Sequence, residues 1–166
     1  GNAYGVYARV EEAYGNISIS NAGRISATAN GLYSTAAGIH AYDQDDGTVS
    51  ITTASTSVIS ATANGYYGNA YGIYANAAYG NVVISNAGSV TAGSTDTYGF
   101  SVGILSDSYY GTTITNTGTV DATGTNPWAI VTYAEGTTIT NSASGKIFGA
   151  IWTASGNEVD SLTNDG

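Results

Sequence analysis

A short pattern built around glycine and one apolar residue recurs along the whole chain. The clearest copies are Tyr4-Gly5-Val6-Tyr7-Ala8, Ala37-Gly38-Ile39-His40-Ala41 and Tyr71-Gly72-Ile73-Tyr74-Ala75. Weaker copies are Val102-Gly103-Ile104, Trp128-Ala129-Ile130 and Gly149-Ala150-Ile151. The second residue of each core triplet falls at 5, 38, 72, 103, 129 and 150, which gives steps of 33, 34, 31, 26 and 21 residues. Repeats of roughly 20–50 residues are typical of solenoids and related arrays.

Two further segments recur within each unit, and both read as strands. In 15–23 the residues alternate, with Ile17 and Ile19 on one face and the intervening serines on the other. Related segments lie at 47–53, 80–88, 111–118 and 136–141. A third alternating segment occurs at 24–27, 58–61, 89–92, 119–122 and 146–149. We therefore expect an all-β fold, a β-solenoid of about six coils with three short strands each.

The repeat also sets the expected domain organisation. Residues 1–166 should form a single β-solenoid domain, with coil boundaries near 30, 64, 94, 124 and 148. Neither end carries a helix or a charged capping segment, so we expect both ends to be uncapped. The ends then either join flanking coils of a longer chain or pair head to tail with other copies.

Composition excludes several classes of function. The chain has no Cys, which removes disulfides, thiol catalysis and ordinary zinc sites. Its 12 acidic and 3 basic residues give a formal charge of −9, which disfavours nucleic acid and anionic lipid as partners. No apolar run approaches the ~20 residues of a membrane span, so we expect no membrane insertion. Low charge with many Ser, Thr, Asn and Gly is typical of an exported bacterial protein.

One asparagine position recurs at the end of the second segment. Stacked coils should align these side chains as a ladder in which each amide bonds to the next. The predicted ladder consists of Asn21, Asn86, Asn116, Asn141 and Asn164. Gly23, Gly88 and Gly118 should supply a corner conformation that a side chain obstructs. In the second coil Thr53 replaces the asparagine and 54–57 adds length, so that corner should bulge.

The pattern Gly-x-Ile-x-Ile-x-Asn-x-Gly-x-Ile-x-Ala, seen for example over 15–27, resembles the coils of autotransporter passenger domains and filamentous-haemagglutinin-type adhesins. The resemblance covers nearly the whole chain. It implies a right-handed parallel β-helix, secreted or displayed on the bacterial cell surface. The matched residues are core and corner positions, so the resemblance speaks to fold more than to function.

Tyrosine is the most unusual residue type in the chain, with 14 copies against two Phe. A stacked column in the core or along a loop edge would explain them, because stacked coils align like residues. An exposed stripe for sugar stacking or subunit contact would explain them equally simply. Tyr7, His40 and Tyr74 share one register and should lie on one face. The candidate contact residues in the loops are Tyr66, Tyr67, Tyr109 and Tyr110.

Ser and Thr alternate with the apolar residues of the second segment, so they should form two outward rows. The most regular part of these rows is Thr113, Thr115, Thr138 and Thr140. A flat Thr-x-Thr face is found in β-solenoid ice-binding proteins, whereas an ordinary solvated strand face has the same composition. Val83 interrupts one of the rows. Ice binding is therefore kept as an alternative hypothesis.

Asp43, Asp45 and Asp46 form an acidic turn whose carboxylates are weak candidate ligands for Ca²⁺. Their spacing does not match an EF-hand loop or the glycine-rich calcium-binding repeats of other β-rolls. No other cofactor is indicated. We identify no catalytic residues, because the chain has one His and one Lys, and Asp107 and Asp121 fall on different strands of one coil. The sequence predicts a non-enzymatic structural or adhesive scaffold. A carbohydrate-binding or ice-binding module is the alternative.

Overall fold

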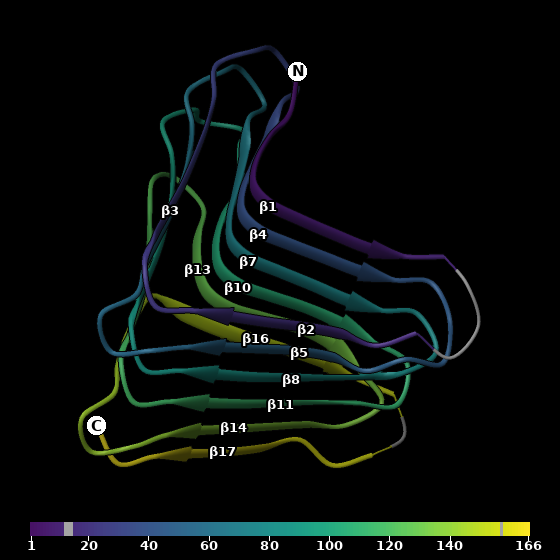
Figure 1. Ribbon diagram of the computed structural model, residues 1–166. Helices are drawn as coiled ribbons and strands as arrows, with labels where there is room; N and C mark the ends of the chain where they lie inside the picture. Colours follow the sequence, from purple (N-terminus) through teal and green to yellow (C-terminus); the bar gives the residue numbers. More distant parts are fainter. Residues whose placement is uncertain (12–14, 157) are drawn as a thin grey trace.

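The fold is a three-sided β-solenoid. The computed structural model describes residues 1–11, 15–156 and 158–166, and every regular element in these ranges is a strand. The chain passes through three parallel sheets in turn, so consecutive strands belong to different sheets and each strand pairs with its counterparts one coil away (Figure 1). The expectation of an all-β solenoid with three strands per coil is confirmed.

Sheet A contains the strands that begin with the glycine-centred repeat. Its order is β1 (Ala3–Val10), β4 (Thr35–Asp43), β7 (Asn69–Ala77), β10 (Ser101–Ser108), β13 (Pro127–Ala134) and β16 (Ala150–Ser155). Sheet B is β2 (Ile17–Asn21), β5 (Val49–Thr53), β8 (Asn81–Asn86), β11 (Gly111–Asn116), β14 (Thr137–Asn141) and β17 (Ser161–Asn164). Sheet C is β3 (Arg24–Ala29), β6 (Val58–Ala63), β9 (Ser89–Ser94), β12 (Thr119–Thr123) and β15 (Lys146–Phe148). The predicted coil boundaries lie within one residue of the ends of β3, β6, β9, β12 and β15.

The centre of the core is formed by three apolar columns, one from each sheet, that run along the solenoid axis, and Ile17, Val49 and Val82 add a further buried column on sheet B. Parallel register places like residues on each other, so every coil adds one side chain to each column. The buried members in the central coils are Ile39, Ile73, Ile104, Ile51, Ile84, Ile114, Ile59, Val90 and Val120. A second cluster contains only alanines, among them Ala29, Ala36 and Ala63, and lies where sheet C leads into sheet A. The small alanine side chain lets the two walls approach closely there.

The asparagine ladder is present from the third coil onward. Asn86 Nδ2 donates to Asn116 Oδ1 (2.8 Å), Asn116 Nδ2 to Asn141 Oδ1 (2.7 Å) and Asn141 Nδ2 to Asn164 Oδ1 (2.7 Å). Asn86, Asn116 and Asn141 are buried, so each side-chain amide supplies the hydrogen bonds that water would otherwise make to the neighbouring amides.

The second coil departs from this pattern in the predicted place. Thr53 Oγ1 donates to Asn86 Oδ1 (2.6 Å), so the hydroxyl continues the ladder. Asn21 does not join it: its Nδ2 donates to Ser57 Oγ (2.6 Å), in the longer 54–57 corner. The prediction that Asn21 belongs to the same ladder is therefore wrong, because the longer corner offers it a closer acceptor.

The corner glycines have a steric role. Gly23, Gly88 and Gly118 do not have the left-handed backbone that would favour glycine. A Cβ on Gly88 would lie 2.5 Å from Ser57 O and 2.7 Å from Ala54 O, in the preceding coil. A Cβ on Gly23 would have its nearest neighbour, Asn21 Oδ1, at 4.0 Å. Glycine is needed at this corner where a preceding coil packs against it.

Replacing Asn116 by Ala should lower the free energy of unfolding by about 3 kcal/mol, because it leaves the buried Asn86 amide and Asn141 carbonyl without ladder partners. Denaturant unfolding measures the change. Thr115→Ala, at the exposed neighbouring position, is the control and should change stability by no more than about 0.5 kcal/mol. Equal effects of the two substitutions would contradict a stabilising ladder.

Replacing Gly88 by Ala should cost about 2 kcal/mol, since the added methyl group must displace backbone of the preceding coil. Gly23→Ala, at the equivalent corner, is the matched control and should be tolerated within about 0.5 kcal/mol. Thermal unfolding of the two variants side by side is the measurement. A Gly23 variant as unstable as the Gly88 variant would show that conformation, and not close approach, selects glycine.

Candidate functional site

The predicted loop tyrosines are on the surface, at two different corners. Tyr66 and Tyr67 lie in the turn between β6 and β7, where Tyr67 stacks on Tyr33 and Tyr98 with ring centroids 5.2 and 5.1 Å apart. The Tyr67 amide donates to Asp96 Oδ2 (2.6 Å). Tyr109 and Tyr110 lie between β10 and β11, with ring centroids 5.1 Å apart. The structure therefore does not bring these four tyrosines into one stripe.

A larger aromatic surface lies on the outer face of sheet A, and we call it the aromatic face. Three outward columns cross the strands in register. The first column is Tyr4, Ala37, Tyr71, Val102, Trp128 and Ala150. The second column is Tyr7, His40, Tyr74, Leu105, Val131 and Trp152. The third column is Arg9, Tyr42, Asn76, Asp107, Tyr133 and Ala154. The prediction that Tyr7, His40 and Tyr74 share a face is confirmed. Among the described residues the tyrosines form no column in the core, whereas Tyr33, Tyr67 and Tyr98 stack along a loop edge, which was the other form of the stacked-column hypothesis.

The N-terminal part of the aromatic face is centred on His40, and we call it the histidine cluster. The imidazole stacks on Tyr74 with centroids 4.7 Å apart and planes 5° apart, and it meets the edge of Tyr7 at 5.2 Å. Burial lowers the pKa of His40, which favours the neutral ring at neutral pH. Nearby, Arg9 lies 5.4 Å from the ring centre of Tyr42. The cluster is thus a stack of mostly neutral rings, of which Tyr7 is the most exposed.

The C-terminal part contains both tryptophans, and we call it the tryptophan cluster. Tyr133 meets Trp152 edge to face at 5.2 Å, and Trp128 lies 6.2 Å from Trp152. Together with Tyr71, Phe100 and Leu105 they line an apolar groove of about 390 Å³. Tyr133 and Trp152 are each 43% exposed, so their rings are accessible from solvent.

Between the two clusters lies a polar pair. Asn76 on β7 and Asp107 on β10 are neighbours in the third column, and Asn76 Nδ2 donates to Asp107 Oδ2 (3.0 Å). Asn76 Oδ1 is buried and has no hydrogen-bond partner among the described residues. Burial raises the pKa of Asp107, and the hydrogen bond from Asn76 opposes that shift. The pair therefore offers acceptor oxygens within an apolar surround.

Only part of this surface follows from the printed sequence. The tyrosines of the early coils stand at visible repeat positions, whereas Leu105, Val131 and Trp152 occupy the same column in less similar copies. Each of them directly follows the isoleucine of its coil, so taking the residue after each isoleucine would have identified the column. The register defines the column, and the residue type does not. Asn76 and Asp107 gave no signal of their own.

The Ser/Thr rows lie where they were predicted. Thr113 pairs with Val83 and Thr138, and Thr115 pairs with Ser85 and Thr140, on the outer face of sheet B. Val83 is 40% exposed and interrupts its row with an apolar side chain.

The acidic turn folds on itself. Asp43 is buried, and its Oδ1 accepts a hydrogen bond from the Asp45 amide (3.0 Å), while Asp46 is exposed. Across the described part of the chain, the carboxylates and the single histidine form no group of three or more positioned to hold a metal ion.

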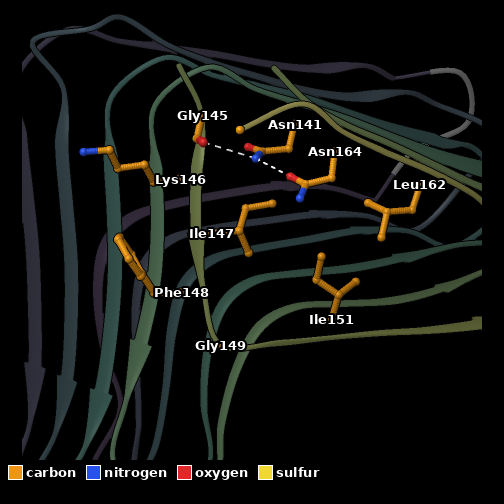
Figure 2. Close-up of a pocket in the computed structure, with 10 residues that line it drawn as sticks. Asn141, Gly145, Lys146, Ile147, Phe148, Gly149, Ile151, Leu162 and Asn164 are labelled. Atoms are coloured by element: carbon orange, nitrogen blue, oxygen red, sulfur yellow. Dashed lines mark hydrogen bonds between the residues drawn. The ribbon is translucent and has the colours of Figure 1, made fainter. Parts of the chain in front are cut away.

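A hollow lies at the end of the core in the C-terminal coil (Figure 2). Its volume is about 460 Å³, and Ile147, Ile151 and Leu162 line it as the last members of the three core columns. Asn141 and Asn164 form its polar side through the ladder hydrogen bond. It is thus a continuation of the solenoid interior and differs from a ligand cleft.

Comparison with known proteins adds no name to this geometry: no family model, no curated protein and no solved structure matches the chain. Within residues 1–11, 15–156 and 158–166, no helix is long and apolar enough to cross a membrane.

The raised pKa of Asp107 predicts a pH-dependent stability. The native state holds this proton more tightly than the unfolded chain, so the ionised carboxyl destabilises the fold above the raised pKa and has no such effect below the ordinary value. Asp107→Asn should therefore raise the melting temperature at pH 7 and have a smaller effect at pH 3. Asp121→Asn, on the outer face of sheet C, is the control. An equal gain at both pH values would contradict an ionisation effect.

Proposed function

We propose that this chain is a non-enzymatic adhesive scaffold, secreted or displayed on the bacterial surface, that binds carbohydrate through the aromatic face. The observation that carries the proposal is the outer side of sheet A, where three columns lie in register and exposed aromatic rings stand beside buried apolar side chains. Tyr7, Tyr133 and Trp152 are 51%, 43% and 43% exposed. Exposed apolar surfaces of this kind commonly mark binding sites.

Carbohydrate suits this face better than a charged partner does. Sugar rings present flat C–H surfaces that pack on aromatic rings, and their hydroxyl groups require hydrogen-bond partners at the rim. Asn76 and Asp107 supply such partners beside Tyr133. The formal charge of −9 opposes anionic glycans, nucleic acid and anionic lipid.

A scaffold role, without catalysis, is supported by the distribution of acidic groups. Asp107 and Asp121 belong to one coil but lie on sheets A and C, and neither stands opposite a second carboxylate in its own column. Hydrolysis of a glycosidic bond by two carboxylates needs them roughly 5–10 Å apart across the bond.

Stacking of further coils is the second part of the proposal. Among the described residues, β1, β2 and β3 at one end and β15, β16 and β17 at the other each pair on one side only. Head-to-tail copies or flanking coils of a longer chain would both extend the three sheets and the asparagine ladder. Head-to-tail copies would also repeat the aromatic face along a rod.

Replacing Tyr7, Tyr133 and Trp152 together by Ser should weaken binding to neutral insoluble polysaccharides by at least about tenfold, because these rings provide accessible stacking area. A pull-down with cellulose, xylan, mannan and chitin measures it. The matched control replaces Tyr66, Tyr109 and Tyr110 at the corners, and circular dichroism checks folding. Loss of binding in the control alone, or no binding by the unmodified chain, would overturn the proposal.

A further inference from the structure

We infer that one neutral polysaccharide chain lies along the solenoid axis on the aromatic face, stacked on the histidine cluster and the tryptophan cluster, with Asn76 and Asp107 binding its hydroxyl groups between them. This inference rests on the proposed function and adds the orientation, the number of contact points and the class of ligand. It makes sheet A one extended site with a stacking platform at each end.

The first argument is the spacing of the two platforms. His40 lies on β4 and Tyr133 on β13, which are three strand positions apart in the order β4-β7-β10-β13. Parallel strands are about 4.8 Å apart, so His40 and Tyr133 are about 14 Å apart along the axis, and the two platforms meet on β7 through Tyr74 and Tyr71. A single sugar ring covers either His40 or Tyr133, whereas only a chain of several units reaches both.

The second argument is the surface between the platforms. Tyr71 and Tyr74 on β7 have ring centroids 5.4 Å apart, and Leu105 on β10 continues the column of Tyr74 towards Val131. This strip is apolar and joins the histidine cluster to the groove of the tryptophan cluster, since Tyr71 and Leu105 also line that groove. A ligand running across the strands therefore stays in contact with the protein between its two stacking points.

The third argument is the position of the polar pair. Asn76 and Asp107 occupy the middle of the third column, with Tyr42 before them and Tyr133 after them. They border the apolar strip on one side, as hydroxyl partners of a chain lying on it must. A carboxylate accepts stronger hydrogen bonds than a neutral oxygen, and Asn76 Nδ2 holds the Asp107 carboxylate in place through its hydrogen bond to Oδ2. Acceptor oxygens suit a donor-rich neutral sugar and oppose an anionic one.

A length series tests the inference on the whole chain. Calorimetric titration with soluble cello-oligosaccharides and manno-oligosaccharides, from the disaccharide to the hexasaccharide, should show an affinity that rises steeply once the ligand spans both platforms. The two platforms then act as linked sites with a high effective concentration. For the hexasaccharide we expect about a tenfold loss in Trp152→Ala and in Tyr7→Ala, and a similar loss in Asp107→Ala. For the disaccharide, at least one of the ring variants should have little effect.

Matched controls separate the possible results. Tyr66→Ala and Asp121→Ala remove an exposed ring and an outer-face carboxylate elsewhere and should leave every affinity unchanged. Saturable binding that needs the aromatic face but is equally strong for short and long ligands would overturn the two-platform inference and leave the proposed function standing. No binding of any oligosaccharide or insoluble polysaccharide would overturn both. A doubled mass in solution that Tyr133→Ser and Trp152→Ser abolish would show that the face binds a second copy of the chain.

Discussion

The structure depends on exact repetition from coil to coil. Each strand bonds to its counterparts in the neighbouring coils through parallel backbone hydrogen bonds, and this register stacks equivalent residues in columns. Isoleucine on isoleucine makes the core, and asparagine on asparagine makes the buried ladder. Because one register governs every column, a residue placed outward in one coil faces outward in all of them.

The same constraint generates the aromatic face. Side chains alternate along each strand of sheet A, so the first and third residues after the core isoleucine or valine form continuous outer columns. In the first coils tyrosine and histidine fill these columns, and in the last coils leucine, valine and tryptophan fill them. Asp107 lies half-buried among these rings, where its charge costs stability, as the raised pKa indicates. Such a cost is common at sites that serve binding.

At the corner that follows sheet B, local sequence determines the hydrogen bonds, and the stacking of coils determines where glycine is required. The ladder position holds asparagine or threonine, and Thr53 continues the ladder through its hydroxyl group, whereas Asn21 bonds to Ser57 in the longer corner. Glycine at the same corner is required by the backbone of the preceding coil, which only the stacked structure contains. A side chain would therefore clash at Gly88, which has a coil packed before it, and would fit at Gly23, which lies in the first coil.

The sequence by itself determined the solenoid, the three strands of each coil, the ladder from Asn86 to Asn164 and the outward Ser/Thr rows. These follow from period-two alternation and from repetition, which are local properties of the chain. Only the tertiary structure decided that the loop tyrosines sit at separate corners, that Asn21 bonds to Ser57, and that Asn76 and Asp107 meet between two aromatic clusters. Those features depend on which residues the register places in neighbouring coils. Asn76 and Asp107 are 31 positions apart, and no local sequence pattern indicates that they lie next to each other.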